Sequence, residues 1–326
     1  MPISTSTKSM TTAERRRILI TGASSGIGLE AAKILQARGD ELTILCRNAE
    51  RSEQTRAALS ESVQTCVADL ADLASVAKAI DVLHQEQTSF DALVLNAGLQ
   101  YAGHRSPRWS RQGIELTFAV NHLAHQFLVE GLRDQARAIV ITASEVHNPS
   151  TGGGRVGQPA GLGTMRGIHQ GAGAAMVDGI SPFNADKAYK DSKLCNLLMA
   201  KEIHRQNPGL PVVAWSPGLV IPRTSDGFFR SSRQANPLGQ ALFGFVARDI
   251  LKLTEGVEQA GGLLVQLIDE APNRPGFTYW SNGLLGPGRH QFSPTEPSQD
   301  ASDGNKATRL WTLSSKLIKA TLSTSS

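Results

Sequence analysis

The sequence predicts an α/β fold in which a doubly wound parallel sheet is covered by helices on both faces. Three observations lead to this prediction. Short aliphatic runs alternate with longer segments whose apolar residues recur at helical spacing. The short runs are apolar throughout, which is typical of strands buried on both faces of a parallel sheet. A glycine-rich turn joins the first run to the first helical segment, at the sheet edge where ligands of such folds bind.

Each element follows from its local pattern. Aliphatic runs bounded by polar turns predict strands, and apolar residues three and four apart predict helices, the first of which ends at Gly39. In the first half we expect strands at 17–21, 42–46, 63–68, 91–95 and 138–142, and helices at 26–38, 49–59, 73–85 and 114–132. In the second half we expect helices at 187–204, 239–253, 256–268 and 306–320, strands at 212–215 and 278–280, and a loop over 287–303.

The chain of 326 residues is interpreted as a single domain over 15–326, preceded by a Ser/Thr-rich tail at 1–14 that we expect to be disordered. Residues 148–186 interrupt the regular pattern, because they are rich in glycine and too many for an ordinary connection. Their aliphatic residues and Phe183 favour a flap that covers a substrate over a disordered insert. A C-terminal extension is expected over 287–326.

Composition restricts the class of ligand. The net charge of +4 suits a small anionic ligand, and the chain lacks the dense basic stripe expected of a nucleic-acid-binding protein. Cys46, Cys66 and Cys195 are widely spaced, so we expect no disulfide framework and a reducing compartment. No metal is expected, because no Cys or His pair has zinc-ligand spacing, and His122 and His125 are interpreted as helix-surface residues.

The sequence predicts neither a membrane span nor a secretory signal. No apolar run approaches the roughly 18 residues that a spanning helix needs. The polar N-terminus lacks an apolar signal region. We therefore expect a cytoplasmic protein.

Residues 21–28 (TGASSGIG) predict a dinucleotide-binding loop, because they follow a strand and open a helix. Gly22 permits the tight turn, Gly26 lets the backbone approach a pyrophosphate, and Gly28 allows close packing of helix and strand. The helix N-terminus offers N–H groups to the phosphates. The expected cofactor contacts in this loop are Gly22, Ser24, Ser25, Gly26, Ile27 and Gly28.

The end of the second strand favours NADP over NAD. Arg47 stands where an acidic residue would hold the ribose hydroxyls of NAD, and its guanidinium can bind a 2′-phosphate. Further cofactor contacts are expected at the ends of successive strands, where side chains meet at one edge of the sheet. They are Asn48 and Arg51, then Asp69 and Leu70, then Asn96, Ala97 and Gly98.

Tyr189 and Lys193 form the predicted catalytic pair. Residues four apart on a helix share a face, so the two side chains project together. A nearby ammonium favours the phenolate, and we therefore expect Lys193 to lower the pKa of Tyr189 from its reference of about 10. Tyr189 would then donate a proton near neutral pH, while Lys193 also holds the nicotinamide ribose.

These motifs together resemble the short-chain dehydrogenase/reductase family, whose fold is of the Rossmann type. The resemblance covers most of the chain and adds Asn121 in the long helix, Ser144 after the fifth strand and Pro217-Gly218 after the sixth. It implies that Asn121 holds a water relay and that Ser144 polarises the substrate oxygen or orients Tyr189. It also implies that Pro217-Gly218 lies near the nicotinamide.

A narrower resemblance is to the light-dependent protochlorophyllide oxidoreductases. It rests on residues 187–196 (KAYKDSKLCN), the insert ending in Ser181-Pro182-Phe183, the strand 277–281 (FTYWS) and the segment 300–317. It implies that NADPH delivers a hydride to C17 of photoexcited protochlorophyllide, and that a proton from Tyr189 then reaches C18. The insert and Phe228–Arg230 would cover the flat macrocycle.

Some positions depart from the narrower pattern. Leu219 replaces that family's cysteine after Pro217-Gly218, Ser216 replaces its tyrosine, and Ser144 stands in place of its threonine. A role for that thiol is therefore absent here. Cys195 matches another cysteine of the family, and the alternative interpretation is a buried packing thiol.

Two other functions stay open. A light-independent NADP-dependent reductase of the carbonyl or retinol type would use the same four residues, Asn121, Ser144, Tyr189 and Lys193. A scaffold could bind NADP on this fold without catalysis. The N-terminus has no obvious transit segment, and we therefore expect a bacterial protein of the cytoplasm. A peripheral attachment to photosynthetic membranes and the formation of homo-oligomers stay open.

Overall fold

The computed structural model describes residues 15–86, 89–221, 223 and 228–323. The tail at 1–14 that we expect to be disordered lies outside the described residues. Within them, each predicted helix and strand has a counterpart, and most ends shift by a few residues. The predicted helix over 239–253 is an α-helix only over Pro237–Gly244, and a π-helical turn over Phe245–Ile250 follows it. No described helix combines the length and the apolar character needed to cross a bilayer.

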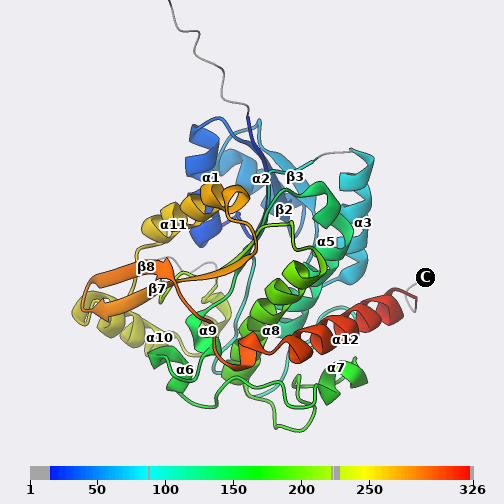
Figure 1. The fold of residues 1–326 in the computed structure, drawn as a ribbon. Coiled ribbons are helices and arrows are strands. Elements are labelled where there is room, and N and C mark those ends of the chain that lie inside the picture. The colour runs from blue at the N-terminus through cyan, green and yellow to red at the C-terminus, as the bar shows by residue number, and fades with distance from the viewer. Residues whose placement is uncertain (1–14, 87–88, 222, 224–227, 324–326) are drawn as a thin grey trace, which may run out of the picture.

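Eight strands form one sheet in the order β3-β2-β1-β4-β5-β6-β7-β8 (Figure 1). The first seven pair in parallel, and β8 is antiparallel to β7. The chain crosses from β3 at one edge to β4 beside β1, so the strand order reverses next to β1, where folds of this type bind ligands. The strands are β1 Arg17–Thr21, β2 Glu41–Cys46, β3 Gln64–Val67, β4 Ala92–Leu95, β5 Ile139–Thr142, β6 Val212–Ser216, β7 Phe277–Gly286 and β8 Arg289–Pro294.

Helices cover both faces of the sheet, as predicted (Figure 1). On one face α1 and α11 bury Leu35 and Leu264 against alternate strand residues. On the other face α3, α5, α8 and α12 bury a larger core that contains Leu128, Leu198 and Leu310. The main helices are α1 Gly26–Ala37, α2 Ala49–Ala58, α3 Leu73–Gln85, α4 Leu116–Phe118, α5 Ala124–Leu132, α8 Ala185–Gln206, α9 Arg230–Ala235, α10 Pro237–Gly244, α11 Val257–Glu270 and α12 Gly304–Ser323.

The expected loop at 287–303 is wrong, because it contains strand β8. The strand β7 is also much longer than predicted, and the two form a hairpin that turns at Gly288, whose φ is +66°. Strand β8 has the sequence RHQFSP, in which Phe292 is the one large apolar residue. An edge strand needs no apolar run, because one side of it faces solvent, and its pairing with β7 decides its conformation.

The predicted helix over 114–132 is interrupted. It begins as α4, passes through the π-helical turn η1 (Ala119–Leu123) and continues as α5. A π-helical turn inserts one residue into the helix and leaves backbone groups without their usual i−4 partners. This turn contains Asn121, so the irregularity lies at a predicted site residue.

The glycine-rich insert at 148–186 is an integral part of the domain. It contains the short helices α6 (Gly152–Arg155) and α7 (Arg166–Gln170), and it contributes Leu162, Met165 and Ile168 to the larger core. The alternative of a disordered segment is therefore wrong. Whether the insert covers a substrate stays a prediction.

Candidate active site

The glycine loop after β1 has the geometry of a nucleotide cradle. Gly22 has a φ of +70°, and a Cβ there would lie 2.7 Å from the Cα of Ala97. A Cβ on Gly28 would lie 2.4 Å from the carbonyl oxygen of Gly22. Both positions therefore need glycine, since the backbone of the loop, of helix α1 and of the Asn96–Gly98 segment pack against one another.

The N-terminus of α1 is open to an anion. Among the described residues no side chain caps it, and its first turn contains no acidic residue. Its first N–H groups therefore lack intrahelical partners and carry the positive end of the helix dipole. The geometry of the loop and of the helix N-terminus is thus compatible with a pyrophosphate, whose binding there stays a prediction.

At the end of β2, Arg47 is exposed and can reach a ligand bound beside the loop. Asn48 has a structural role that the sequence analysis did not assign, because its Oδ1 accepts a hydrogen bond from the backbone N–H of Arg51 at 2.9 Å and caps α2. The Oδ1 atom of Asn48 is therefore already bonded within the protein. Arg47 is exposed and Arg51 is half-buried, and a phosphate contact by either one stays a prediction.

Asn96 ties three strand ends together. Its Nδ2 donates to the carbonyl oxygens of Thr21 and Gly22, both at 3.3 Å, and its Oδ1 accepts from the Thr142 hydroxyl at 3.2 Å. The backbone N–H groups of Asn96 and Ala97 both donate to the Thr21 Oγ1 at 2.9 Å. Asn96 therefore holds the carboxyl edges of β1, β4 and β5 in one arrangement.

The predicted catalytic pair meets at this edge. Lys193 Nζ lies 5.7 Å from the centroid of the Tyr189 ring and donates to the Thr142 carbonyl at 3.0 Å. A Cβ placed on Gly98 would lie 3.5 Å from Lys193 Nζ and 3.5 Å from Asn121 Oδ1. The structure thus brings together the pair, Asn121 and the Asn96–Gly98 segment.

The pKa values of the pair differ from expectation. Burial raises the pKa of Tyr189 above its ordinary value, and the Ser144 hydroxyl opposes that effect in part. The predicted lowering by Lys193 is therefore wrong for the protein by itself. Burial also lowers the pKa of Lys193 to about 7, so its amine is only partly charged at neutral pH and is a weak source of positive potential.

Asn121 and Ser144 occupy the predicted places. Asn121 Nδ2 donates to the Leu99 carbonyl at 2.9 Å and to Ser192 Oγ at 3.0 Å, and its Oδ1 accepts from the Leu99 N–H at 2.8 Å. These bonds use both amide hydrogens of the side chain and hold it against Leu99 and Ser192. A role of Asn121 in a water relay stays a prediction. Ser144 follows β5, and its hydroxyl is close enough to Tyr189 to oppose the rise in the pKa of that phenol.

The interpretation of His122 and His125 as surface residues is wrong, because both are fully buried. Burial lowers the pKa of His122 to about 3 and that of His125 to about 4, so both are neutral. His125 Nδ1 lies 3.0 Å from the Asn121 carbonyl and must donate to it, and Nε2 lies 3.0 Å from Thr21 Oγ1. His125 thus joins the glycine loop to the π-helical turn.

Thr142 also lies in the site, although it was not among the predicted residues. Its carbonyl accepts from Lys193, and its hydroxyl joins Asn96 to the indole N–H of Trp215, which lies at 3.0 Å. No sequence motif marks Thr142. For His125 a signal was present, because it follows Asn121 by four residues and so shares its helix face.

The segment after β6 closes the site from another side. Gly218 has a φ of +77°, and a Cβ there would lie 2.7 Å from the Asn282 carbonyl. Leu219, which stands in the place of the family cysteine, packs with Phe228, Ile221, Phe229 and Ala247. The Phe228 ring stands edge-on to Tyr189 at 5.2 Å between centroids. The segment 228–251 therefore contacts Tyr189 through Phe228.

Cys195 lies apart from this chemistry. It is fully buried in the larger core, and burial raises the pKa of its thiol well above the ordinary value. A buried, protonated thiol is neither a good nucleophile nor a ready proton donor. This environment supports the interpretation of Cys195 as a packing residue.

Comparisons with known proteins agree with this geometry. The short chain dehydrogenase model matches residues 16–151. Protochlorophyllide reductase of Avena sativa is 33% identical over 320 residues, which cover 92% of this chain and 99% of that protein. Chloroplastic protochlorophyllide reductase A of Oryza sativa subsp. japonica is 34% identical, over 92% of this chain and 80% of that protein. An uncharacterized protein from Mycobacterium paratuberculosis has a similar solved structure, with a TM-score of 0.66, 24% identity and 93% coverage of both chains.

Proposed function

This chain belongs to the short-chain dehydrogenase/reductase family and is an oxidoreductase of that family, and from this premise we propose that it reduces the C17–C18 double bond of protochlorophyllide to chlorophyllide. The reaction would use NADPH and light, as a step of chlorophyll or bacteriochlorophyll biosynthesis. The observation that carries the proposal is the meeting of Tyr189, Lys193 and Ser144 at the carboxyl edge of the sheet, under an aromatic cover. The similarity to protochlorophyllide reductases over nearly the whole chain supports this choice of substrate.

The residues present fit NADPH. The open N-terminus of α1 and the Gly22–Gly28 turn would hold the pyrophosphate, and Arg47 would hold the 2′-phosphate. Asp69 and Leu70 would lie along the adenine, and Asn96–Gly98, Lys193 and Pro217-Gly218 along the nicotinamide ribose and ring. When bound, the cofactor supplies the hydride, and the protein supplies position and a proton.

Tyr189 is the proposed proton donor. Its raised pKa keeps the phenol protonated at neutral pH, so the proton is in place before the reaction begins. The Ser144 hydroxyl favours the phenolate that forms after transfer, because a hydrogen bond to the charged form lowers its energy. Lys193 lies close enough to stabilise the same charge when its amine is protonated.

Aromatic side chains suit a flat macrocycle. Phe228 covers Tyr189 from the 228–251 segment, and the insert ends in Phe183, which stacks on Tyr101 at 5.9 Å between centroids. Such surfaces would exclude water and hold one ring bond of the substrate in a fixed place. The photon supplies the excitation, so the protein needs only to orient and shield the pigment.

The proposal includes peripheral attachment to a membrane surface. Helix α10 and the π-helical turn η4 (Phe245–Ile250) expose several large apolar side chains. The exposed fractions are 85% for Leu238, 64% for Leu242, 53% for Phe245 and 56% for Ile250. Apolar side chains on the outer face of a short helix are typical of an interfacial helix.

The experiment that tests the function compares dark and illuminated mixtures of the protein, NADPH and protochlorophyllide. We expect the absorption band of chlorophyllide to appear only after illumination. A Tyr189→Phe variant should bind NADPH as the wild type does and turn over about 100-fold to 10,000-fold more slowly, because it lacks the donor proton.

If illumination gives no chlorophyllide while the protein reduces carbonyl substrates in the dark, the light-independent reductase replaces our proposal. Leu219, in the place of the family cysteine, is the observation that keeps this second function in view. If the wild type binds NADPH but reduces neither class of substrate, a scaffold is the remaining function.

A further inference from the structure

Three charged residues of helix α8 are buried on the side of the helix that faces the insert. Lys187 is 7% exposed, Lys190 is 5% exposed and Asp191 is fully buried. They lie at positions i, i+3 and i+4, and so share one face of α8, next to the face that carries Tyr189 and Lys193. Burial of a charge is costly unless the charge is paired and hydrogen-bonded, so the partners of these residues reveal their role.

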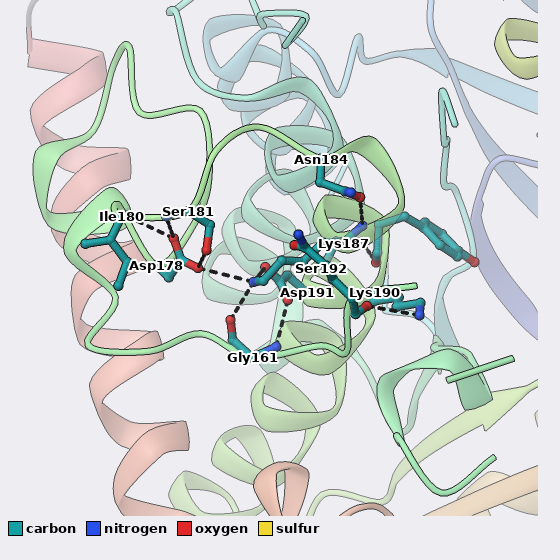
Figure 2. Close-up of polar contacts among 11 residues, drawn as sticks. Gly161, Asp178, Ile180, Ser181, Asn184, Lys187, Lys190, Asp191 and Ser192 are labelled. Carbon is teal, nitrogen blue, oxygen red and sulfur yellow. Dashed lines mark hydrogen bonds and ion pairs between the residues drawn. The ribbon is translucent and has the colours of Figure 1, made fainter. Parts of the chain in front are cut away.

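The partners of Lys187 and Asp191 lie largely in the insert, as Figure 2 shows. Lys187 Nζ lies 2.6 Å from Asp191 Oδ2 and 3.3 Å from Asp178 Oδ2, and it donates to the Gly161 carbonyl at 2.8 Å. The Gly161 N–H donates in turn to Asp191 Oδ1 at 2.8 Å. Gly161 is therefore held to α8 through both of its backbone groups.

Asp178 extends this contact to a second part of the insert. Its Oδ1 accepts from the N–H groups of Ile180 and Ser181 at 3.0 and 2.9 Å, and its Oδ2 accepts from the Ser181 hydroxyl at 2.6 Å (Figure 2). The bonds to Ser181 and Lys187 hold the pKa of Asp178 at about 2 although burial acts against them. The Asp178–Ser181 turn is thus fixed to Lys187 as a charged unit.

Lys190 holds a third part of the insert. Its ammonium donates to the carbonyl oxygens of Gly154 at 3.0 Å and Gln158 at 3.1 Å, and also to that of Val156. An ammonium has three N–H donors, so these three carbonyls satisfy it completely. The chain that leaves α6 therefore wraps around the side chain of Lys190.

The insert also reaches the site itself. It begins next to the turn Glu145–His147, which follows Ser144, and it ends at Phe183, whose ring stacks on Tyr101 beside Leu99. Leu99 is the residue whose backbone holds the side chain of Asn121. A displacement of the insert would therefore disturb the neighbours of both Ser144 and Asn121.

We propose that Lys187, Lys190 and Asp191 are positioning residues that lock the insert onto the catalytic helix and so fix the wall of the substrate site beside Tyr189. They act through the insert and have no contact with the reacting atoms. Movement of the insert along α8 would separate these buried charges from their partners. Because an unpaired buried charge is costly, the intact set holds the insert in one position. The identity of the substrate rests on the function proposed above, whereas the lock does not.

Hydrogen–deuterium exchange of the full-length protein tests the lock without any substrate. In Lys190→Met we expect the amides at 152–158 to exchange about tenfold faster or more, with 178–181 less affected. In Lys187→Met we expect the reverse pattern, with faster exchange at 161 and 178–181. Lys201→Met is the matched control, because it removes the same charge from the same helix about two turns beyond Lys193.

Unchanged exchange of the insert in both variants would overturn the proposal, and so would a uniform increase over the whole chain. Should Lys187→Met fail to fold, the Lys190 variants decide the question through the 152–158 amides. Lys190→Arg keeps the charge and several donors, so it should restore at least part of the protection.

Kinetics then test the effect on the site. In Lys190→Met the KM for protochlorophyllide should rise about tenfold while the Kd of NADPH changes less than about twofold, because the cradle at α1 is untouched. Equal losses for both ligands would contradict a role through the insert. If the wild type does not reduce protochlorophyllide, the proposed function fails, and the exchange result alone then decides whether the lock exists.

Discussion

At the scale of single residues, burial determines the pKa of the charged groups in the site. Lys193 is 2% exposed and keeps a hydrogen bond to the Thr142 carbonyl, yet its pKa falls to about 7 because its ammonium has left water. Asn196 Nδ2 donates to the same carbonyl at 3.2 Å, so Thr142 does not depend on Lys193 for a partner. Burial of the Lys193 amine thus has a cost in stability, and such a cost is common for ionisable groups at functional sites.

This cost predicts a pH dependence of folding. Between pH 7 and pH 10.5 the unfolded chain holds a proton on Lys193 that the folded chain has lost, so the wild type becomes more stable as pH rises. Lys193→Met removes the effect. The variant should therefore be more stable than the wild type at pH 7, with a gain that shrinks toward pH 10 by up to about 1.4 kcal/mol per pH unit.

Urea denaturation of both proteins without cofactor at pH 7, 8 and 9 measures this difference in the free energy of unfolding. Lys319→Met, on the exposed side of α12, is the control and should show no such trend. A stability difference between wild type and Lys193→Met that stays constant from pH 7 to pH 9 would contradict the prediction.

At the scale of elements, each strand end supplies one part of the site. The end of β1 and the start of α1 form the phosphate cradle, the end of β2 presents Arg47, and the end of β5 presents Ser144 to the tyrosine of α8. Parallel pairing places all of these ends on one edge. A ligand that spans this edge would therefore contact residues that are far apart in the sequence.

Arg47 should decide between the two nicotinamide dinucleotides. An Arg47→Ala variant should bind NADPH about ten- to 100-fold more weakly, because it loses a charge-assisted contact to the 2′-phosphate, and its affinity for NADH should be nearly unchanged. Fluorescence titration with each cofactor measures both dissociation constants. Arg56→Ala is the control, because Arg56 lies in helix α2, which follows Arg47, and its guanidinium bonds to Thr65. Equal loss for NADPH and NADH would contradict the assignment.

At the scale of the whole molecule, the segment 228–251 has two faces. Its inner face packs on Tyr189 through Phe228, and its outer face carries the exposed apolar residues of α10 and η4. It adjoins the β7–β8 hairpin (Figure 1), where the Gly288 N–H donates to the Lys252 carbonyl at 2.7 Å. The hairpin tip itself exposes Leu284 and Leu285.

This surface predicts binding to vesicles. A Leu242→Glu/Phe245→Glu double variant should co-sediment with anionic phospholipid vesicles about tenfold less than the wild type, because buried carboxylates disfavour insertion into the interface. Val82→Glu changes an exposed apolar residue on α3 and is the control. Equal sedimentation of all three proteins, or self-association of the wild type in place of vesicle binding, would show that this surface has another role.

Much of the fold could be predicted because its signals are local. The strand β1 and the helix α3 begin and end where the sequence predicts, since aliphatic runs and helical spacing mark them directly. Strand β8 could not be predicted, because a polar edge strand is decided by its partner. The π-helical turn at Asn121 and the burial of His125 likewise depend on what packs around the helix.

The sequence by itself determined the order of the elements, the glycine cradle and the spacing that places Tyr189 and Lys193 on one face, because each of these is set within a few residues of chain. Only the tertiary structure decided how much water reaches those groups, and hence that both of their pKa values move by burial. It alone also shows that the buried charged side chains of α8 bond to the insert. Burial and pairing depend on neighbours distant in sequence, and so they follow only from the packed molecule.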